Sequence, residues 1–371
     1  PYMQRLAARV FEIRKNRVKI AYPLDLFEPG NIPQILSSVA GNVFGMKAVK
    51  NLRLEDIHFP ERLVRSFKGP RFGIEGVRKI IGVKERPLVG TIIKPKLGLR
   101  AKDHARVAYE AWVGGCDIVK DDENLSSQRF NPFEKRVKET LKMKEKAEKE
   151  TGERKAYLPN VTAETEEMLR RAGFVKELGG EFVMVDILTC GFSALQTLRN
   201  QELGLVVHGH RAMHAAITRN KKHGISMLVI AKLARLIGVD QLHIGTAVGK
   251  MEGGREDVQG IEDEIEEGII SPHEEEHVLG QRWYGIKPVF AVCSGGLHPG
   301  LTPRLVSMLG KNIIIQMGGG IHGHPDGTRA GARAARQSVD AAVEGIPLKE
   351  YAKTHRELRA ALKEWLPSLI K

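Results

Sequence analysis

The sequence predicts an α/β fold, a C-terminal (β/α)8 TIM barrel preceded by a partial α+β N-terminal domain of ferredoxin-like type. From about residue 71 onward one unit repeats: a short apolar run, a polar or glycine-containing turn, then an amphipathic stretch. The unit occurs eight times over about 270 residues, which matches a barrel better than a doubly wound sheet. The residues before it lack this rhythm.

The eight apolar runs are the predicted barrel strands, because alternating strand and helix signals favour a parallel sheet. They cover 88–93, 116–119, 156–158, 182–187, 205–208, 241–244, 289–293 and 312–316. Amphipathic periodicity predicts helices over 102–113, 164–177, 224–237, 302–309 and 328–343.

The N-terminal part of the sequence lacks the strand–helix repeat. Residues 7–21 and 32–45 predict strands and a helix outside the repeat. Pro60 and the Gly69-Pro70 pair are punctuation typical of a linker. We therefore expect an N-terminal α+β domain over 1–68 and a barrel with C-terminal helices over 69–371.

Composition narrows the class of partner. The 58 Lys and Arg against 45 Asp and Glu give a net charge of +13, but aromatic residues make up only 6% and the basic residues are dispersed. A nucleic-acid binder would concentrate basic residues and interleave aromatics, so we expect no nucleic-acid partner. No apolar run approaches the roughly 20 residues of a membrane span. A site for a multiply phosphorylated anion also accounts for basic excess.

The three cysteines (Cys116, Cys190 and Cys293) are widely spaced along the chain. Their spacing fits neither a disulfide framework nor a metal knuckle, which favours a reducing cytoplasm.

The carboxyl ends of barrel strands carry the chemistry of this architecture, and the second predicted strand ends in Lys120-Asp121-Asp122-Glu123. Carboxylate oxygens suit Mg2+. Strand alternation puts Lys120 and Asp122 on one face, and a turn would add Glu123. A protonated amine cannot ligate a cation, so Lys120 either neutralises the carboxylates or is carbamylated by CO2 to give a third oxygen ligand. An acidic turn capping a helix is the alternative.

Lysines and histidines follow other predicted strands. Lys94 and Lys96 are expected on one strand face, where two amines in one cavity lower each other's pKa and suit a general base or an electrostatic clamp; surface lysines are the alternative. His210, His214 and His243 are candidate acid–base groups or metal ligands, or structural histidines.

Glycine-rich turns end the last two predicted strands. Gly318-Gly319-Gly320 precedes a helical pattern, and bare backbone N–H groups at a helix start can hold a phosphate. Ser294-Gly295-Gly296 is a weaker case of the same kind. Arg211 is a further candidate for a bidentate phosphate contact. Lys250 lies on a glycine-bounded segment, 245–254, with the composition of a mobile lid.

Six motifs in order resemble the large subunit of ribulose-1,5-bisphosphate carboxylase/oxygenase (RuBisCO), and the resemblance covers nearly the whole chain. They are GTIIKPKLGL (90–99), GGCDIVKDDEN (114–124), HGHRAMHAA (208–216), HIGTAVGKMEG (243–253), SGGLHPG (294–300) and QMGGGIHGHP (316–325). The segments 208–220 and 350–365 resemble archaeal-type form III enzymes, which work without small subunits and are linked to nucleoside monophosphate salvage (AMP salvage).

The resemblance implies a role for each matching residue. Carbamylated Lys120, Asp122 and Glu123 would hold Mg2+, Lys94 and His210 would move protons, and Lys250 would stabilise the carboxylate that forms after CO2 attack. The implied substrate-binding residues are Asn42, Lys96, Arg211, His243, Ser294, Gly295, Gly318 and Gly319. Asn42 would be donated by the neighbouring subunit, so the active unit would be a homodimer or an oligomer of dimers.

The implied reaction is carboxylation, with competing oxygenation by O2, of ribulose-1,5-bisphosphate to 3-phosphoglycerate through a magnesium-stabilised enediolate. The alternatives are a RuBisCO-like enolase or isomerase of a related phosphate sugar and a truncated, non-catalytic ligand-binding relative. Family members begin earlier and use a glutamate and a threonine–tryptophan pair from that earlier segment, so we expect this chain to start inside the N-terminal domain.

Overall fold

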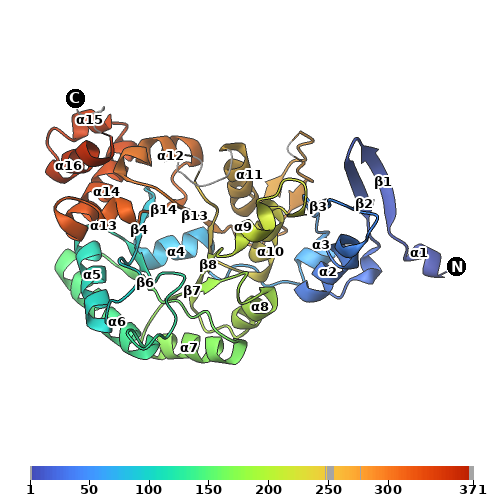
Figure 1. Ribbon diagram of the computed structural model, residues 1–371, viewed down its shortest axis with the longest axis horizontal. Coiled ribbons are helices and arrows are strands. Elements are labelled where there is room, and N and C mark those ends of the chain that lie inside the picture. The colour runs from blue at the N-terminus through green and yellow to red at the C-terminus, as the bar shows by residue number, and fades with distance from the viewer. Residues whose placement is uncertain (1, 247, 249–254, 276, 367–371) are drawn as a thin grey trace.

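The computed structural model describes residues 2–246, 248, 255–275 and 277–366. An N-terminal part lies at one end of the long axis, the barrel in the middle and the C-terminal helices at the other end (Figure 1). No helix in the described ranges is long and apolar enough to cross a membrane.

Eight parallel strands form the barrel, in the order β6-β5-β4-β14-β13-β10-β8-β7. A parallel bridge between Asn160 and Met184 closes the ring between β6 and β7, with the amide of Met184 donating to the carbonyl of Pro159 at 2.8 Å. The strands are β4 Leu88–Ile92, β5 Ile118–Lys120, β6 Ala156–Leu158, β7 Phe182–Asp186, β8 Val206–His210, β10 Gln241–His243, β13 Phe290–Ser294 and β14 Ile313–Gln316. The predicted barrel and all eight of its strands are confirmed.

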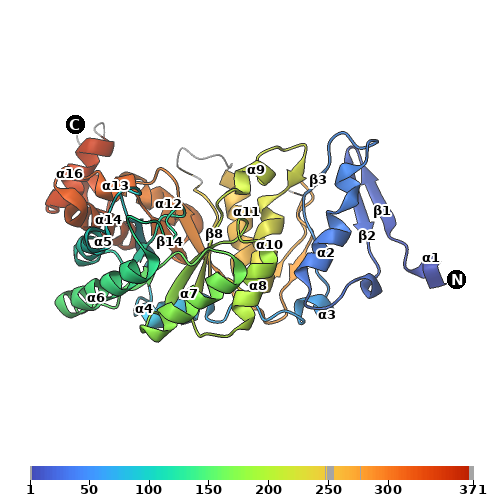
Figure 2. The same cartoon turned by 60° about the horizontal axis from the view of Figure 1, so that its bottom comes forward.

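Most of the helices that follow the N-terminal part surround the strands, but α4 covers one end of the barrel and α15 and α16 lie at the C-terminal end of the molecule (Figure 2). They are α4 Gly73–Ile81, α5 Ala101–Gly114, α6 Phe133–Thr151, α7 Thr165–Glu177, α8 Phe192–Asn200, α9 His214–Thr218, α10 Met227–Ile237, α11 Arg255–Glu266, α12 Thr302–Leu309, α13 Gly319–His322, α14 Gly327–Glu344, α15 Leu348–Tyr351 and α16 Arg356–Trp365, with the 3-10 turn η3 Pro299–Leu301. The helix expected from residue 224 begins at Met227, because Gly224 and Ile225 form the short strand β9 and the Ser226 hydroxyl caps the helix by accepting from the amide of Val229.

The N-terminal part contains helices and a hairpin, as expected of an α+β domain. Its elements are α1 Tyr2–Arg5, β1 Arg9–Arg14, β2 Arg17–Ala21, η1 Leu24–Leu26, α2 Ile32–Val39, η2 Asn42–Gly45, β3 Arg53–Leu54 and α3 Glu61–Val64. The strand β3 pairs in parallel with β9 Gly224–Ile225, and a separate two-stranded sheet joins β11 Ile269–Ile270 to β12 Gln281–Arg282. The division of the chain at 68/69 stays a prediction.

The amino-terminal half of the barrel interior is apolar. Every second residue of each strand points inward, and a buried cluster joins these side chains to α4, which covers the amino-terminal end of the barrel. Its members from the strands are Leu88, Ile118, Ala156, Leu158, Phe182, Met184, Val206, Phe290, Val292 and Ile314. The alternate residues pack outward against the surrounding helices.

Asp240 joins α4 to the strands. Its buried carboxylate accepts from the backbone amides of Phe72 (2.7 Å), Gly73 (2.9 Å) and Val207 (3.0 Å). One side chain therefore satisfies the start of α4 and the start of β8, where buried amides would otherwise lack acceptors.

We predict that Asp240→Asn lowers the free energy of unfolding by about 2 kcal/mol, because the amide presents N–H groups to backbone donors and leaves them unpaired. Urea unfolding followed by circular dichroism measures the change. Asp25→Asn, an exposed acid at η1, is the control and should change stability by less than about 0.5 kcal/mol. Equal stability of the two variants would contradict the role of Asp240.

Candidate functional site

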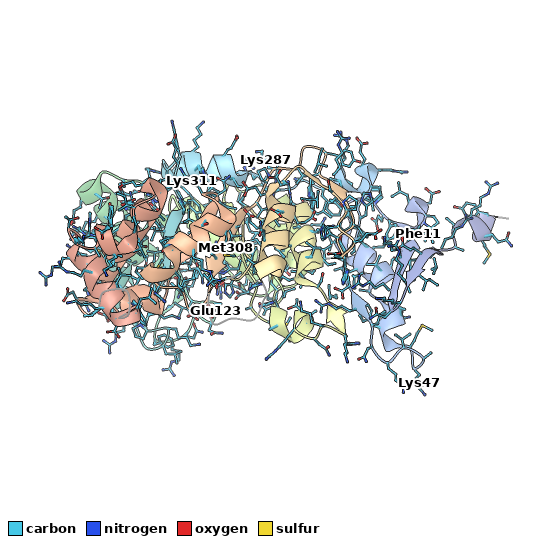
Figure 3. All side chains as sticks on the ribbon, turned by 90° about the horizontal axis from the view of Figure 1, so that it is seen from above. Phe11, Lys47, Glu123, Lys287, Met308 and Lys311 are labelled. Atoms are coloured by element: carbon cyan, nitrogen blue, oxygen red, sulfur yellow. The ribbon has the colours of Figure 1, made fainter. Side chains whose placement is uncertain are left out.

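The predicted site residues of the barrel gather at the carboxyl ends of its strands. In Figure 3, Glu123, which follows β5, lies on the opposite side of the molecule from Lys287 and Lys311, which precede β13 and β14. Inward alternation continues above the apolar layer into polar residues, namely Lys120, Asp186, His208, His210, Gln241, His243, Ser294 and Gln316. The strand pattern that builds the core therefore also places the polar groups.

The acidic turn after β5 brings together a lysine and two carboxylates. Lys120 is fully buried, its Nζ donates to the carbonyl of Asp121 at 2.8 Å, and it lies 3.9 Å from Glu123 Oε2. Burial lowers the pKa of Lys120, although Glu123 and the other nearby carboxylates raise it. A lowered pKa favours the neutral amine, which is the nucleophilic form.

Lys94 is tied to this turn. Its Nζ donates to Asp122 Oδ2 at 2.8 Å, and the amide of Asn124 donates to Asp122 Oδ1 at 3.1 Å. Burial alone raises the pKa of Asp122, but these hydrogen bonds and the charge of Lys94 lower it overall. The carboxylate is therefore ionised, as a metal ligand requires.

Lys94 and Lys96 do not share a strand face as expected. The strand β4 ends at Ile92, so both lysines lie in the loop that follows it. Lys96 is exposed and donates to Asn124 Oδ1 at 3.1 Å, whereas Lys94 donates to Asp122. Proline at 95 lacks the amide that a strand needs, which explains the early end of β4.

Asp121 lies between Lys120 and Asp122, and its side chain holds the turn in place from the side that faces away from the cavity. Its buried carboxylate receives Arg136 Nε at 3.0 Å, the Tyr157 hydroxyl at 2.8 Å and the amide of Asn160 at 3.0 Å. Burial raises the pKa of Asp121, but Arg136, His104 and these donors together lower it. We did not single out Asp121 from the sequence, although strand alternation indicated that its side chain points away from the cavity.

Three histidines lie beside this cluster, at the ends of β8 and β10 and in α9. His210 Nδ1 lies 2.7 Å from Asp186 Oδ1, and its Nε2 lies 3.9 Å from Glu123 Oε2. His243 lies between His208 and Ser294, at 2.8 Å from each. His214 is bonded to Thr218 within α9 at 3.0 Å.

Arg211, which follows His210, is a candidate anion-binding residue. Burial lowers the pKa of Arg211 to about 10, and its guanidinium has no hydrogen-bond or ion-pair partner within the part of the chain that the structure describes. A Cβ on Gly245 would lie 2.6 Å from Arg211 Nη2, so a larger residue there would displace the guanidinium, and the φ of +99° at Gly245 also favours glycine. A half-buried guanidinium without a partner is suited to bind a phosphate.

Two glycine turns lie together after β13 and β14. Gly318 precedes α13, Gly319 is open to solvent on its side-chain side, and Gly295 has a φ of +117°. A Cβ on Gly320 would lie 2.3 Å from the carbonyl oxygen of Leu297, so the two turns pack directly against each other. Bare amides in such turns can bind phosphate oxygens.

Two predicted residues are not part of this cluster. Asn42 is exposed at the start of η2 in the N-terminal part, and the described contacts do not link it to the barrel residues. Lys250 lies outside the described residues.

Sequence reasoning also missed Gln241 and treated His208 only as a strand end. Both are inward residues buried below His243, and His208 Nδ1 lies 2.7 Å from Gln241 Oε1. Two-residue alternation back from His210 and His243 is the signal that finds them.

The donor set fits a magnesium ion only when Lys120 contributes an oxygen. Among the described residues, no group of three or more His, Cys, Asp or Glu side chains is placed to hold a metal. Asp122 and Glu123 supply carboxylate oxygens, and the buried amine of Lys120 lies 3.9 Å from Glu123 Oε2. A carbamate on Lys120 would complete three oxygen ligands and leave positions open for water or substrate.

Comparisons with known proteins agree over the whole chain. Residues 73–365 match the ribulose bisphosphate carboxylase large chain, catalytic domain, and residues 1–63 match the N-terminal domain of that chain. The ribulose bisphosphate carboxylase of Methanocaldococcus jannaschii is 55% identical over 371 residues, which cover 98% of this chain and 87% of the relative. That of Pyrococcus furiosus is 52% identical over 368 residues, covering 98% and 84%.

Solved structures give the same result. The dimeric archaeal Rubisco from Hyperthermus butylicus superposes with a TM-score of 0.93 at 49% identity, covering 98% of this chain and 86% of that one. The octameric enzyme from Pyrococcus horikoshii OT3 gives 0.91 at 51% identity, covering 98% and 84%. The chain belongs to the ribulose bisphosphate carboxylase (RuBisCO) large-chain family.

Proposed function

We propose that the chain catalyses carboxylation of ribulose-1,5-bisphosphate, in which CO2 and water are added to the five-carbon bisphosphate and two molecules of 3-phosphoglycerate are released. The observation that carries this proposal is the buried Lys120 beside Asp122 and Glu123, with Lys94 bonded to Asp122. The identity of the substrate is inferred from the family, and this cluster provides the groups that would act on it.

Lys120 would be activated before turnover. Its neutral Nζ attacks the carbon of CO2, a nitrogen–carbon bond forms, and one proton leaves the nitrogen to give a carbamate. The new oxygens, with Asp122 and Glu123, would hold Mg2+. When bound there, magnesium supplies a Lewis acid that polarises a substrate carbonyl.

Lys94 and His210 would move protons. Lys94 Nζ, which donates to Asp122 Oδ2, could give a proton to substrate carbon, and it could take one only after losing its own. The Asp186 carboxylate at 2.7 Å orients the ring of His210 and leaves Nε2 facing Glu123 and the cavity. His210 would serve hydration and proton transfer from that position.

Binding would use the anion sites. Arg211 and the turns at Gly318, Gly319 and Gly295 would hold phosphates, and His243 and Ser294 the sugar between them. Lys96 would help to hold the substrate at the rim, and Lys250 would stabilise the carboxylate formed after CO2 attack. Two relatives of known structure are a dimer and an octamer, so we propose a homodimer or an oligomer of dimers, without small subunits, in which Asn42 completes the partner's site.

Further properties follow from the same resemblance and are part of the proposal. O2 would compete with CO2 for the substrate. The enzyme would act in the cytoplasm, in nucleoside monophosphate salvage.

We predict 3-phosphoglycerate from purified protein given Mg2+, bicarbonate and ribulose-1,5-bisphosphate without oxygen, measured by a coupled assay. Lys120→Ala should abolish product, because neither the carbamate nor the complete metal site can form, and EDTA should do the same to the unchanged protein. If the folded protein consumes ribulose-1,5-bisphosphate without gain of carbon, the carboxylase proposal fails and a RuBisCO-like enolase is indicated.

Lys94→Met should lower the rate of carboxylation at least about 100-fold, because it removes a proton-transfer group, yet isotope-labelled CO2 should still form a carbamate on Lys120. Lys102→Met removes an exposed lysine of α5 and should leave the rate unchanged. Full activity of Lys94→Met would remove this residue from the reaction.

Mixed dimers test whether Asn42 acts across the subunit interface. Asn42→Ala and Lys94→Met proteins should each be nearly inactive, but their co-expressed heterodimer should recover activity, because one of its two sites then has both native residues. Activity of the separated heterodimer is the measurement. If mixing restores nothing, Asn42 acts within its own chain or not at all.

A further inference from the structure

Four side chains form one buried hydrogen-bonded chain that ends at the substrate-facing surface of the barrel. It runs from Gln241 Oε1 to His208 Nδ1 (2.7 Å), from His208 Nε2 to His243 Nε2 (2.8 Å), and from His243 Nδ1 to Ser294 Oγ (2.8 Å). The first three are buried, and Ser294 is half-buried at the end of β13. The mechanism above uses only the last two.

Both histidines are neutral. Burial lowers the pKa of His208 and of His243 well below the ordinary value, and nearby Lys120 and His210 lower both further. A neutral imidazole carries its proton on one nitrogen and accepts on the other. Each link therefore determines the polarity of the next.

The polarity follows from Gln241. Its Oε1 can only accept, so His208 carries its proton on Nδ1 and accepts at Nε2. His243 must then donate from Nε2, which leaves its Nδ1 to accept from the Ser294 hydroxyl. The reverse orientation of the Gln241 amide would turn every donor in the chain around, so the tautomer of His243 reports the polarity directly.

We propose that His208 and Gln241 are positioning residues that hold His243 in the Nε2–H tautomer and thereby make Ser294 a hydrogen-bond acceptor. With its hydrogen given to His243, Ser294 Oγ presents only lone pairs to the cavity. It therefore takes a ligand donor, a sugar hydroxyl, rather than a phosphate oxygen. This inference deepens the proposed function and rests on it for the identity of the sugar.

His208 offers a matched pair of substitutions. His208→Leu removes the acceptor for His243 Nε2–H, so His243 is free to change tautomer and the Ser294 hydroxyl is free to turn. His208→Gln keeps an amide oxygen as acceptor there. Met184→Leu, an apolar inward residue of β7, controls for altered packing in the barrel interior.

The experiment records nitrogen resonances of isotope-labelled histidine in the full-length protein, with His243 assigned from a His243→Gln spectrum, and measures affinity for ribulose-1,5-bisphosphate by calorimetry. We expect the Nε2–H tautomer of His243 in the unchanged protein, in His208→Gln and in Met184→Leu. In His208→Leu this tautomer should be lost and affinity should fall about tenfold, against less than about twofold in the other two variants.

A proton on His243 Nδ1 in the unchanged protein would overturn the proposal, as would native tautomer and affinity in His208→Leu. If His208→Gln behaves like His208→Leu despite equal thermal stability, the acceptor role of His208 is wrong. The expected tautomers and affinities without any 3-phosphoglycerate would refute the carboxylase function and still support the polarity of the chain.

Discussion

The alternation of side chains along eight parallel strands is the constraint on which the site depends. Because a closed barrel gives each strand one inward face, every second residue must face a single axis. In the amino-terminal half of the strands these positions are apolar and join α4 in one core. At the carboxyl ends the same positions hold Lys120, His210, His243 and Ser294. The strands alone bring these four groups together, whereas Lys94, Asp122 and Glu123 come from the segments that follow β4 and β5.

This regularity explains how much could be predicted from sequence. The eight strands, five of the helices and the strand-end residues could be predicted from hydrophobic periodicity and turn residues, because buried parallel strands leave a strong apolar signal. The early end of β4 was missed, although Pro95 indicated it. The anchoring of Asp121 by Arg136 and Tyr157 was missed because those partners lie 15 and 36 residues away, and hydrogen bonds at such separations leave no periodic signal.

Two kinds of buried charge and polarity coexist in the barrel. Asp121 and Asp240 are saturated by donors and hold backbone in place. Lys120 lies among carboxylates, and Arg211 has no partner in the described part of the chain. Transferring a charged group from water into the protein interior costs free energy unless a partner compensates its charge. A ligand of opposite charge would provide that compensation when it binds. The saturated acids provide the rigid support that such a site needs.

The contact between Gly320 and Leu297 fixes the positions of the two glycine turns relative to each other. Since the turns after β13 and β14 touch through backbone, with no side chain between them, neither can shift without displacing the other. Arg211 follows a different strand, β8, and lies beside Gly245, where it forms a second candidate anion site. A ligand with a phosphate at each end, as proposed above, would therefore meet one anion site whose two turns are held together by backbone contact and a second site at Arg211.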